Sequence, residues 1–128
     1  LWTSLKSLEF KDSSLDVLGL YLFRIEGNCL ESFKLCAIHK LSNEKFNASD
    51  ASNFNEFISD RLVHLSINGY ESEKLYAKMF KNMAELKCLE FRSNKINIIE
   101  NESFCNLKKL EKIDLSRNLL NKFDSSSY

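Results

Sequence analysis

The chain has 128 residues, of which 44% are hydrophobic and 28% are charged. This is the composition of a folded protein, which excludes disorder along the whole chain. The 18 basic and 18 acidic residues cancel, so no charge excess points to a nucleic-acid partner. No apolar run reaches the length of a membrane span, and attachment to a membrane would need a segment absent from this sequence.

A line of apolar residues recurs along the chain. The two clearest copies are displaced by one constant step, so that Leu86, Leu89, Phe91, Asn94 and Ile96 return as Leu110, Ile113, Leu115, Asn118 and Leu120. A weaker copy starts at Leu62, and two degenerate copies of unequal length start at Leu5 and Leu30. We therefore expect one array of repeats over residues 1–128, which begins and stops inside the pattern and so represents a fragment of a longer array.

Each copy should form one short strand. Apolar residues such as Leu89 and Phe91 alternate with polar ones, which is the period of a half-buried strand. Successive strands should stack in parallel with their apolar side chains in one continuous core, because no single repeat can bury its apolar face alone. Asn94 and Asn118 lie where the chain turns out of the strand.

Two segments carry helical signals. In the long second copy, Asn53 and Glu56 form a capping-box-like start, which predicts a short helix after a polar loop at residues 47–52. The segment Glu71–Glu85 can be interpreted as an amphipathic helix or as part of the repeat. A short helical turn would satisfy both interpretations.

The strand pattern also assigns a row of solvent-facing side chains. A dense charged cluster is expected on this face in the last repeats, with His64 beside it, and the cluster consists of Glu90, Arg92, Lys112, Asp114 and Arg117. These residues are candidates for ligand contact. The alternative is a solvated face balanced by cross-strand pairs, and the lack of aromatic side chains favours it.

The sequence contains no convincing catalytic or metal site. His64 and Cys88 occupy the same position of adjacent repeats, and a Cys–His pair can form a nucleophile. A third orienting group, an oxyanion donor and a pocket are not evident, so we expect no enzyme. The pair Cys36 and His39 has no second pair at ligand spacing, so no metal or cofactor is expected.

The cysteines and sequons give weaker signals. The repeat spacing separates the four cysteines too far for bridges, which predicts mostly free thiols, with Cys29–Cys36 as the one plausible exception. Two N-x-S sequons occur, at Asn47 and Asn101, and both are permitted glycosylation sites away from the strand face.

The repeated line, with Phe80 and Phe104 at its nineteenth position, resembles the typical 24-residue subfamily of leucine-rich repeats. The resemblance implies an α/β solenoid, namely a horseshoe segment with a concave parallel sheet of about five strands and an irregular or short-helical convex side. It implies that Asn94 and Asn118 form a ladder of hydrogen bonds to backbone groups of adjacent turns.

In function, the resemblance implies a non-catalytic scaffold that recognises a protein ligand or partner subunit. Arrays of this kind are found mainly in extracellular or cell-surface glycoproteins of animals, including Toll-like receptor ectodomains and secreted insect proteins of innate immunity. The alternative is a cytoplasmic adaptor or regulatory subunit, which free cysteines would favour.

Overall fold

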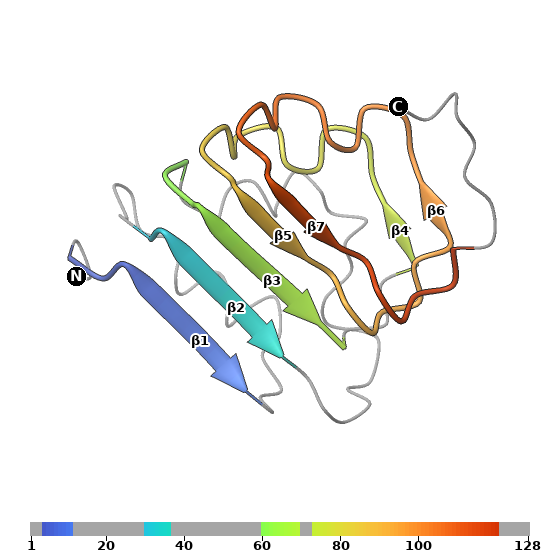
Figure 1. The fold of residues 1–128 in the computed structure, drawn as a ribbon, viewed down its shortest axis with the longest axis horizontal. Coiled ribbons are helices and arrows are strands. Elements are labelled where there is room, and N and C mark those ends of the chain that lie inside the picture. Colours follow the sequence, from blue (N-terminus) through green and yellow to red (C-terminus); the bar gives the residue numbers. More distant parts are fainter. Residues whose placement is uncertain (1–3, 12–29, 37–59, 70–72, 121–128) are drawn as a thin grey trace.

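A computed structural model describes residues 4–11, 30–36, 60–69 and 73–120 (Figure 1). Five parallel strands form one sheet in the order β1-β2-β3-β5-β7, which confirms the predicted parallel sheet. Its strands are β1 (Ser7–Lys11), β2 (Ser32–Cys36), β3 (His64–Asn68), β5 (Cys88–Glu90) and β7 (Lys112–Asp114). A second, two-stranded sheet pairs β4 (Lys74–Leu75) with β6 (Ile98–Ile99).

The strands of the larger sheet meet at equivalent positions of successive segments. Ser7 lies opposite Ser32, and Ser32 lies opposite His64. His64 in turn faces Cys88, and Cys88 faces Lys112. The steps from strand to strand therefore equal the spacings of the apolar line in the sequence, with the second step the longest and the last two equal.

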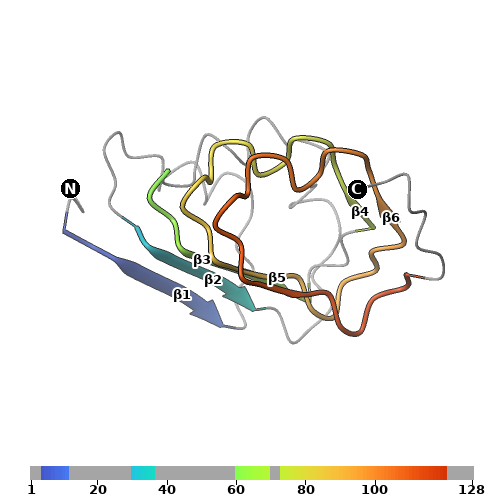
Figure 2. The ribbon, with the colours of Figure 1, turned by 45° about the horizontal axis from the view of Figure 1, so that its top comes forward.

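From β3 to β5 and from β5 to β7, the chain passes through turns and one strand of the smaller sheet before it returns to the larger sheet, and each such circuit forms one coil (Figure 2). The inside of this coil is apolar, because alternate side chains of β3 and β5 point into it. Phe80 lies at its centre, edge-to-face with Phe91 at 5.7 Å between ring centroids and stacked on Phe104 at 6.4 Å. The largest fully buried side chains are Phe80, Phe91, Leu62, Leu65, Ile67, Leu75, Met79, Met83, Leu86, Leu89 and Ile96.

Burial falls away at the last strand. Ile113, predicted to point into the core, is 43% exposed, and Leu115 is half-buried. β7 is the outermost strand of the described sheet, so within the described residues these side chains have a neighbouring repeat on one side only. Apolar burial in a stacked array depends on neighbours, and an end repeat lacks one of them.

The amphipathic helix considered for Glu71–Glu85 is not formed in the described part of that segment, which begins at residue 73. Instead, β4 is followed by turns with backbone hydrogen bonds between residues three apart, such as Met83 N–H to Phe80 O at 2.9 Å. Lys78 has a φ of 58°, and a left-handed residue interrupts a right-handed helix. Pairing of β4 with β6 holds this segment to the next coil. No helix in the described ranges is long and apolar enough to cross a membrane. The helix predicted after Asn53 lies outside the described residues.

Two asparagines join the coils where the chain leaves the sheet. Asn94 is 5% exposed, and its amide nitrogen donates to the carbonyl of Ile67 at 2.9 Å and to that of Arg92 at 3.3 Å. Asn118 donates to the carbonyl of Phe91 at 2.7 Å and accepts from Ile96 N–H at 3.0 Å. Each side chain thereby satisfies backbone groups of the preceding coil that the strands leave unpaired.

The turns on the other side of the coil have a polar support that the sequence analysis did not identify. Glu100 accepts from Ala77 N–H at 2.8 Å and pairs with Lys74. Ser103, 1% exposed, donates to the carbonyls of Leu75 and Glu100. A buried hydroxyl needs such partners, so Ser103 has a structural role. Ser103 is also the serine of the Asn101 sequon, and its structural role explains a serine at this position without glycosylation.

We predict that Asn94→Asp destabilises the fold. The change keeps the shape but removes the amide donor and places a carboxylate oxygen against buried carbonyl oxygens. It should lower the free energy of unfolding, measured with urea, by about 1–3 kcal/mol. The matched control is Asn97→Asp, because Asn97 is exposed in the same repeat. Equal effects of the two substitutions would show that the asparagine hydrogen bonds contribute nothing.

Candidate functional site

The candidate site is the sheet face, meaning the outward side of β3, β5 and β7. Register places His64 opposite Cys88 and Ser66 opposite Glu90. It continues with Cys88 opposite Lys112 and Glu90 opposite Asp114. The backbone hydrogen bonds of the sheet therefore gather polar side chains that are far apart in the sequence.

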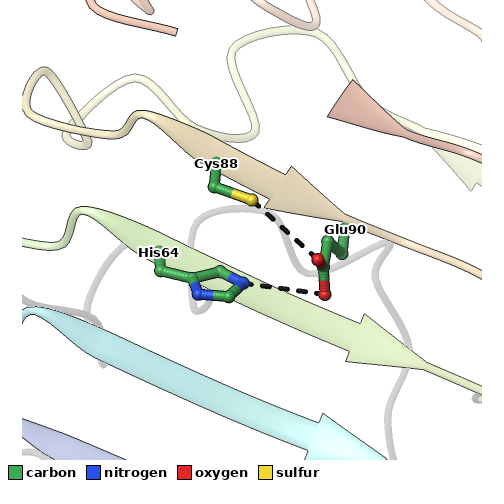
Figure 3. Close-up of side chains that lie close together, drawn as sticks. All are labelled: His64, Cys88 and Glu90. Carbon is green, nitrogen blue, oxygen red and sulfur yellow. Dashed lines mark hydrogen bonds and ion pairs between the residues drawn. The ribbon is translucent and has the colours of Figure 1, made fainter. Parts of the chain in front are cut away.

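His64, Cys88 and Glu90 form a cluster on this face (Figure 3). The imidazole Nε2 of His64 lies 3.6 Å from Oε2 of Glu90, and the Cys88 thiol donates to Oε1 at 3.9 Å. One donor atom from each residue lies within 4.8 Å of the others. The expectation that His64 and Cys88 lack a third group is therefore wrong. Glu90 follows Cys88 by two positions, so strand alternation places both side chains on the same face.

A chain of hydrogen bonds holds the Glu90 carboxylate in place. The backbone N–H of Arg92 donates to Oδ1 of Asn68 at 2.8 Å, and the amide nitrogen of Asn68 donates to the hydroxyl of Ser66 at 2.9 Å. The hydroxyl of Ser66 is bonded to Glu90. Ser66 and Asn68 are not among the residues predicted to act on the sheet face. Their equivalence to Glu90 and Arg92, one repeat further along the chain, is the signal that could have found them.

Ion pairs join the rest of the face. Lys112 Nζ lies 3.6 Å from Oε1 of Glu90, and Arg92 Nε lies 3.7 Å from Oδ2 of Asp114. Among the described contacts, Arg117 does not join this network. It lies in the turn after β7 with a φ of 57°. The structure thus brings His64, Glu90, Lys112, Arg92 and Asp114 together and leaves Arg117 at the margin.

The surroundings shift the pKa of three groups on the sheet face, namely Cys88, Glu90 and Asp114. Burial and the nearby Glu90 carboxylate raise the pKa of the Cys88 thiol. For Glu90, burial acts to raise the pKa, but the Ser66 hydrogen bond and the charges of His64, Arg92 and Lys112 outweigh it, so the pKa is lowered. Hydrogen bonds from Ser66 and Ser116 thus keep Glu90 and Asp114 ionised, since the side chain and N–H of Ser116 lower the pKa of Asp114.

These protonation states limit the chemistry of the cluster. A thiol with a raised pKa stays protonated at neutral pH and is a weak nucleophile. The cluster combines a nitrogen, a sulfur and a carboxylate oxygen around one point, and its surroundings carry paired charges. This arrangement suits binding of a cation or of a charged partner surface better than covalent chemistry.

The other predicted features lie apart from the cluster. Asn101 is exposed in a turn between β6 and β7, away from the sheet face, and Asn47 lies outside the described residues. Cys36, Cys88 and Cys105 are free thiols, as predicted. Because Cys36 is free, the structure gives no support to the Cys29–Cys36 bridge, and Cys29 itself lies outside the described residues.

A parallel sheet of five strands, with its strands in register, fits a solenoid-like fold. Residues 60–120, just under half of the chain, match the family model described as leucine rich repeat, and this match supports a leucine-rich repeat family. Domains of that family generally act in protein–protein recognition and are typically non-catalytic scaffolds. No curated protein and no solved structure matches the chain.

We predict that Cys88 reacts slowly with iodoacetamide, because alkylation follows the thiolate fraction. The rate should reach half its maximum at a higher pH than in an unstructured peptide of the same local sequence. Glu90→Gln should move this point to lower pH, since it removes a negative charge beside the thiol. Mass spectrometry of the Cys88 peptide measures the rate. The Cys105 peptide serves as an internal control that Glu90→Gln should leave unchanged, and a Cys88 titration at or below that of the peptide would contradict the prediction.

Proposed function

We propose that this chain is a recognition scaffold that binds a protein through the sheet face. One observation carries the proposal: three strands in register present alternating charges on one outward surface. The ion pairs Lys112–Glu90 and Arg92–Asp114 span neighbouring strands, and the His64 imidazole lies beside Glu90 from the third strand. A surface of this kind can select a partner by charge complementarity.

The energetics of these pairs suit exchange with a partner. The Arg92 and Lys112 side chains are 50% and 61% exposed, and an ion pair at such exposure is worth about 0–1 kcal/mol. Breaking the internal pair therefore costs little when a partner's carboxylate replaces Glu90 or Asp114. A partner whose charges do not complement the sheet face would place like charges next to each other, which disfavours its binding.

We further propose that residues 1–128 form one array of the typical 24-residue subfamily, curved as a horseshoe. The equal steps from β3 to β5 and from β5 to β7, together with Phe80 and Phe104 in the core, support this subfamily. The parent protein is then a receptor ectodomain of the Toll-like kind or a secreted binding protein, placed outside the cell and glycosylated at Asn47 and Asn101. A role in innate immunity rests on analogy with that subfamily.

One observation favours a second candidate, an intracellular adaptor or regulatory subunit. Cys36, Cys88 and Cys105 are all free thiols. Disulfides are common in secreted proteins and rare in the reducing cytoplasm, so unpaired cysteines favour an intracellular protein.

Site-specific photo-crosslinking tests the proposed binding face. A photoreactive amino acid is placed at Lys112 on β7 or at Lys108, which is exposed in the turn before β7. We expect a protein cross-link from Lys112 and none from Lys108. With the partner so identified, Arg92→Glu should weaken its affinity by about ten-fold or more, whereas Lys108→Glu should not. Cross-links from Lys108 alone would overturn the proposed face.

A second experiment separates the two cellular settings. The full-length protein from its native cells is treated with a glycosidase, and its free thiols are counted under denaturing conditions. An extracellular protein should shift in mass by the loss of one or two glycans. Four free thiols, the number of cysteines in the chain, without a mass shift would reject the extracellular assignment in favour of the intracellular one.

A further inference from the structure

We propose that His64, Cys88 and Glu90 form a binding site for a divalent cation of the Zn²⁺ class. The ligands are Nε2 of His64, Sγ of Cys88 and one carboxylate oxygen of Glu90 (Figure 3). Three protein ligands leave a fourth coordination position for water or for a donor from another molecule. This site goes beyond the recognition function and does not depend on it.

The spacing of the three donors is close to that of a bound metal. With bonds of about 2.0–2.3 Å and tetrahedral angles, ligand atoms around Zn²⁺ lie roughly 3.3–3.6 Å apart. Here the His64 nitrogen lies 3.6 Å from one Glu90 oxygen, and the Cys88 sulfur lies 3.9 Å from the other. No pair of donors is separated by more than 4.8 Å. Side-chain rotations that move the donor atoms by roughly 1 Å would therefore bring them to metal-ligand spacing without movement of the strands.

The imidazole of His64 supplies an independent indication. Its Nε2 is buried and has no hydrogen-bond partner, although the atom is turned toward Glu90 (Figure 3). A buried polar atom without a partner is unusual and calls for an explanation. The nearest Glu90 oxygen, at 3.6 Å, lies beyond hydrogen-bond distance, and a cation bound between the three side chains would give this nitrogen a close partner.

The carboxylate is also positioned in advance. Ser66 is 3% exposed and is bonded to Glu90, and Asn68 donates to Ser66. Such outer hydrogen bonds fix the orientation of a metal-binding carboxylate and raise the affinity of the site. A solvated surface charge has no need of this buried support.

The mixture of donors selects the class of cation. Ca²⁺ and Mg²⁺ prefer oxygen ligands alone, whereas a thiolate and an imidazole together favour Zn²⁺ and similar borderline ions. On binding, His64 coordinates as the neutral imidazole, the metal–sulfur bond replaces the S–H bond of Cys88, and the released proton passes to solvent. The bound cation and the thiolate then add one net positive charge to the cluster.

Lys112 opposes this charge. Its ammonium lies 3.6 Å from Oε1 of Glu90, but the side chain is 61% exposed and can turn into solvent. Lys112→Met should therefore strengthen cation binding by about three- to ten-fold, since one nearby positive charge is removed. If Lys112 had only a structural role on the surface, its replacement would not be expected to strengthen metal binding.

Cobalt titration of the full chain tests the site, because Co²⁺ takes Zn²⁺-like positions and absorbs light according to its ligands. We expect a thiolate-to-Co²⁺ band in the near ultraviolet that Zn²⁺ displaces at one equivalent. Cys88→Ser should abolish the band, and His64→Asn or Glu90→Gln should weaken binding about ten-fold or more. The matched control is Cys105→Ser, which removes a free thiol elsewhere and should bind as the unmodified chain does.

A second readout needs no substitution and so avoids variants that fold poorly. Zn²⁺ should protect Cys88 from alkylation in the native chain while Cys105 stays reactive. Absence of the cobalt band together with unchanged Cys88 alkylation would overturn the proposal. A band that survives Cys88→Ser, or one that depends on Cys88 but not on His64 and Glu90, would overturn it as well.

Discussion

Each segment of this chain can bury its apolar side chains only against the next segment. Leu65 and Leu89 illustrate the constraint, since they lie opposite each other on β3 and β5 and are both fully buried. Stacking in this way leaves backbone N–H and carbonyl groups without hydrogen bonds where the chain turns out of the sheet beside the core. Asn94 and Asn118 supply partners by bonding to carbonyls of the preceding coil. The hydrophobic contacts and the asparagines therefore depend on the same spacing.

The outward face follows from the same stacking. Once Leu89 points inward, Cys88 and Glu90 must point outward, and register places them beside His64 and Lys112. The cluster is thus a by-product of the strand geometry, and its chemistry depends on which polar residues occupy these positions. Ser66 and Asn68 turn that proximity into a fixed arrangement, because they hold the Glu90 carboxylate from one side.

The strands, their parallel order and their register could be predicted from the apolar line, because the spacing of leucines reflects the core directly. The turns could not. The apolar spacing of Glu71–Glu85 suits a helix as well as a repeat segment with turns. The φ of 58° at Lys78 cannot be recognised from the residue type, because lysine does not favour this conformation. Within the candidate site, the His64–Cys88 pair followed from equal repeat positions. Glu90 was predicted in the charged cluster but not beside this pair, because equal repeat positions identify neighbours across strands and not the residue two places along the same strand.

The step along the chain from β2 to β3 is longer than the step from β3 to β5, yet Ser32–Cys36 pairs with His64–Asn68 at every position of both strands. Extra length is therefore absorbed entirely between the strands. Insertions and deletions in the connecting segments can accumulate without shifting which side chains stand next to one another on the sheet. Such a protein can change its return segments and its sheet face independently, so the two surfaces are free to evolve at different rates.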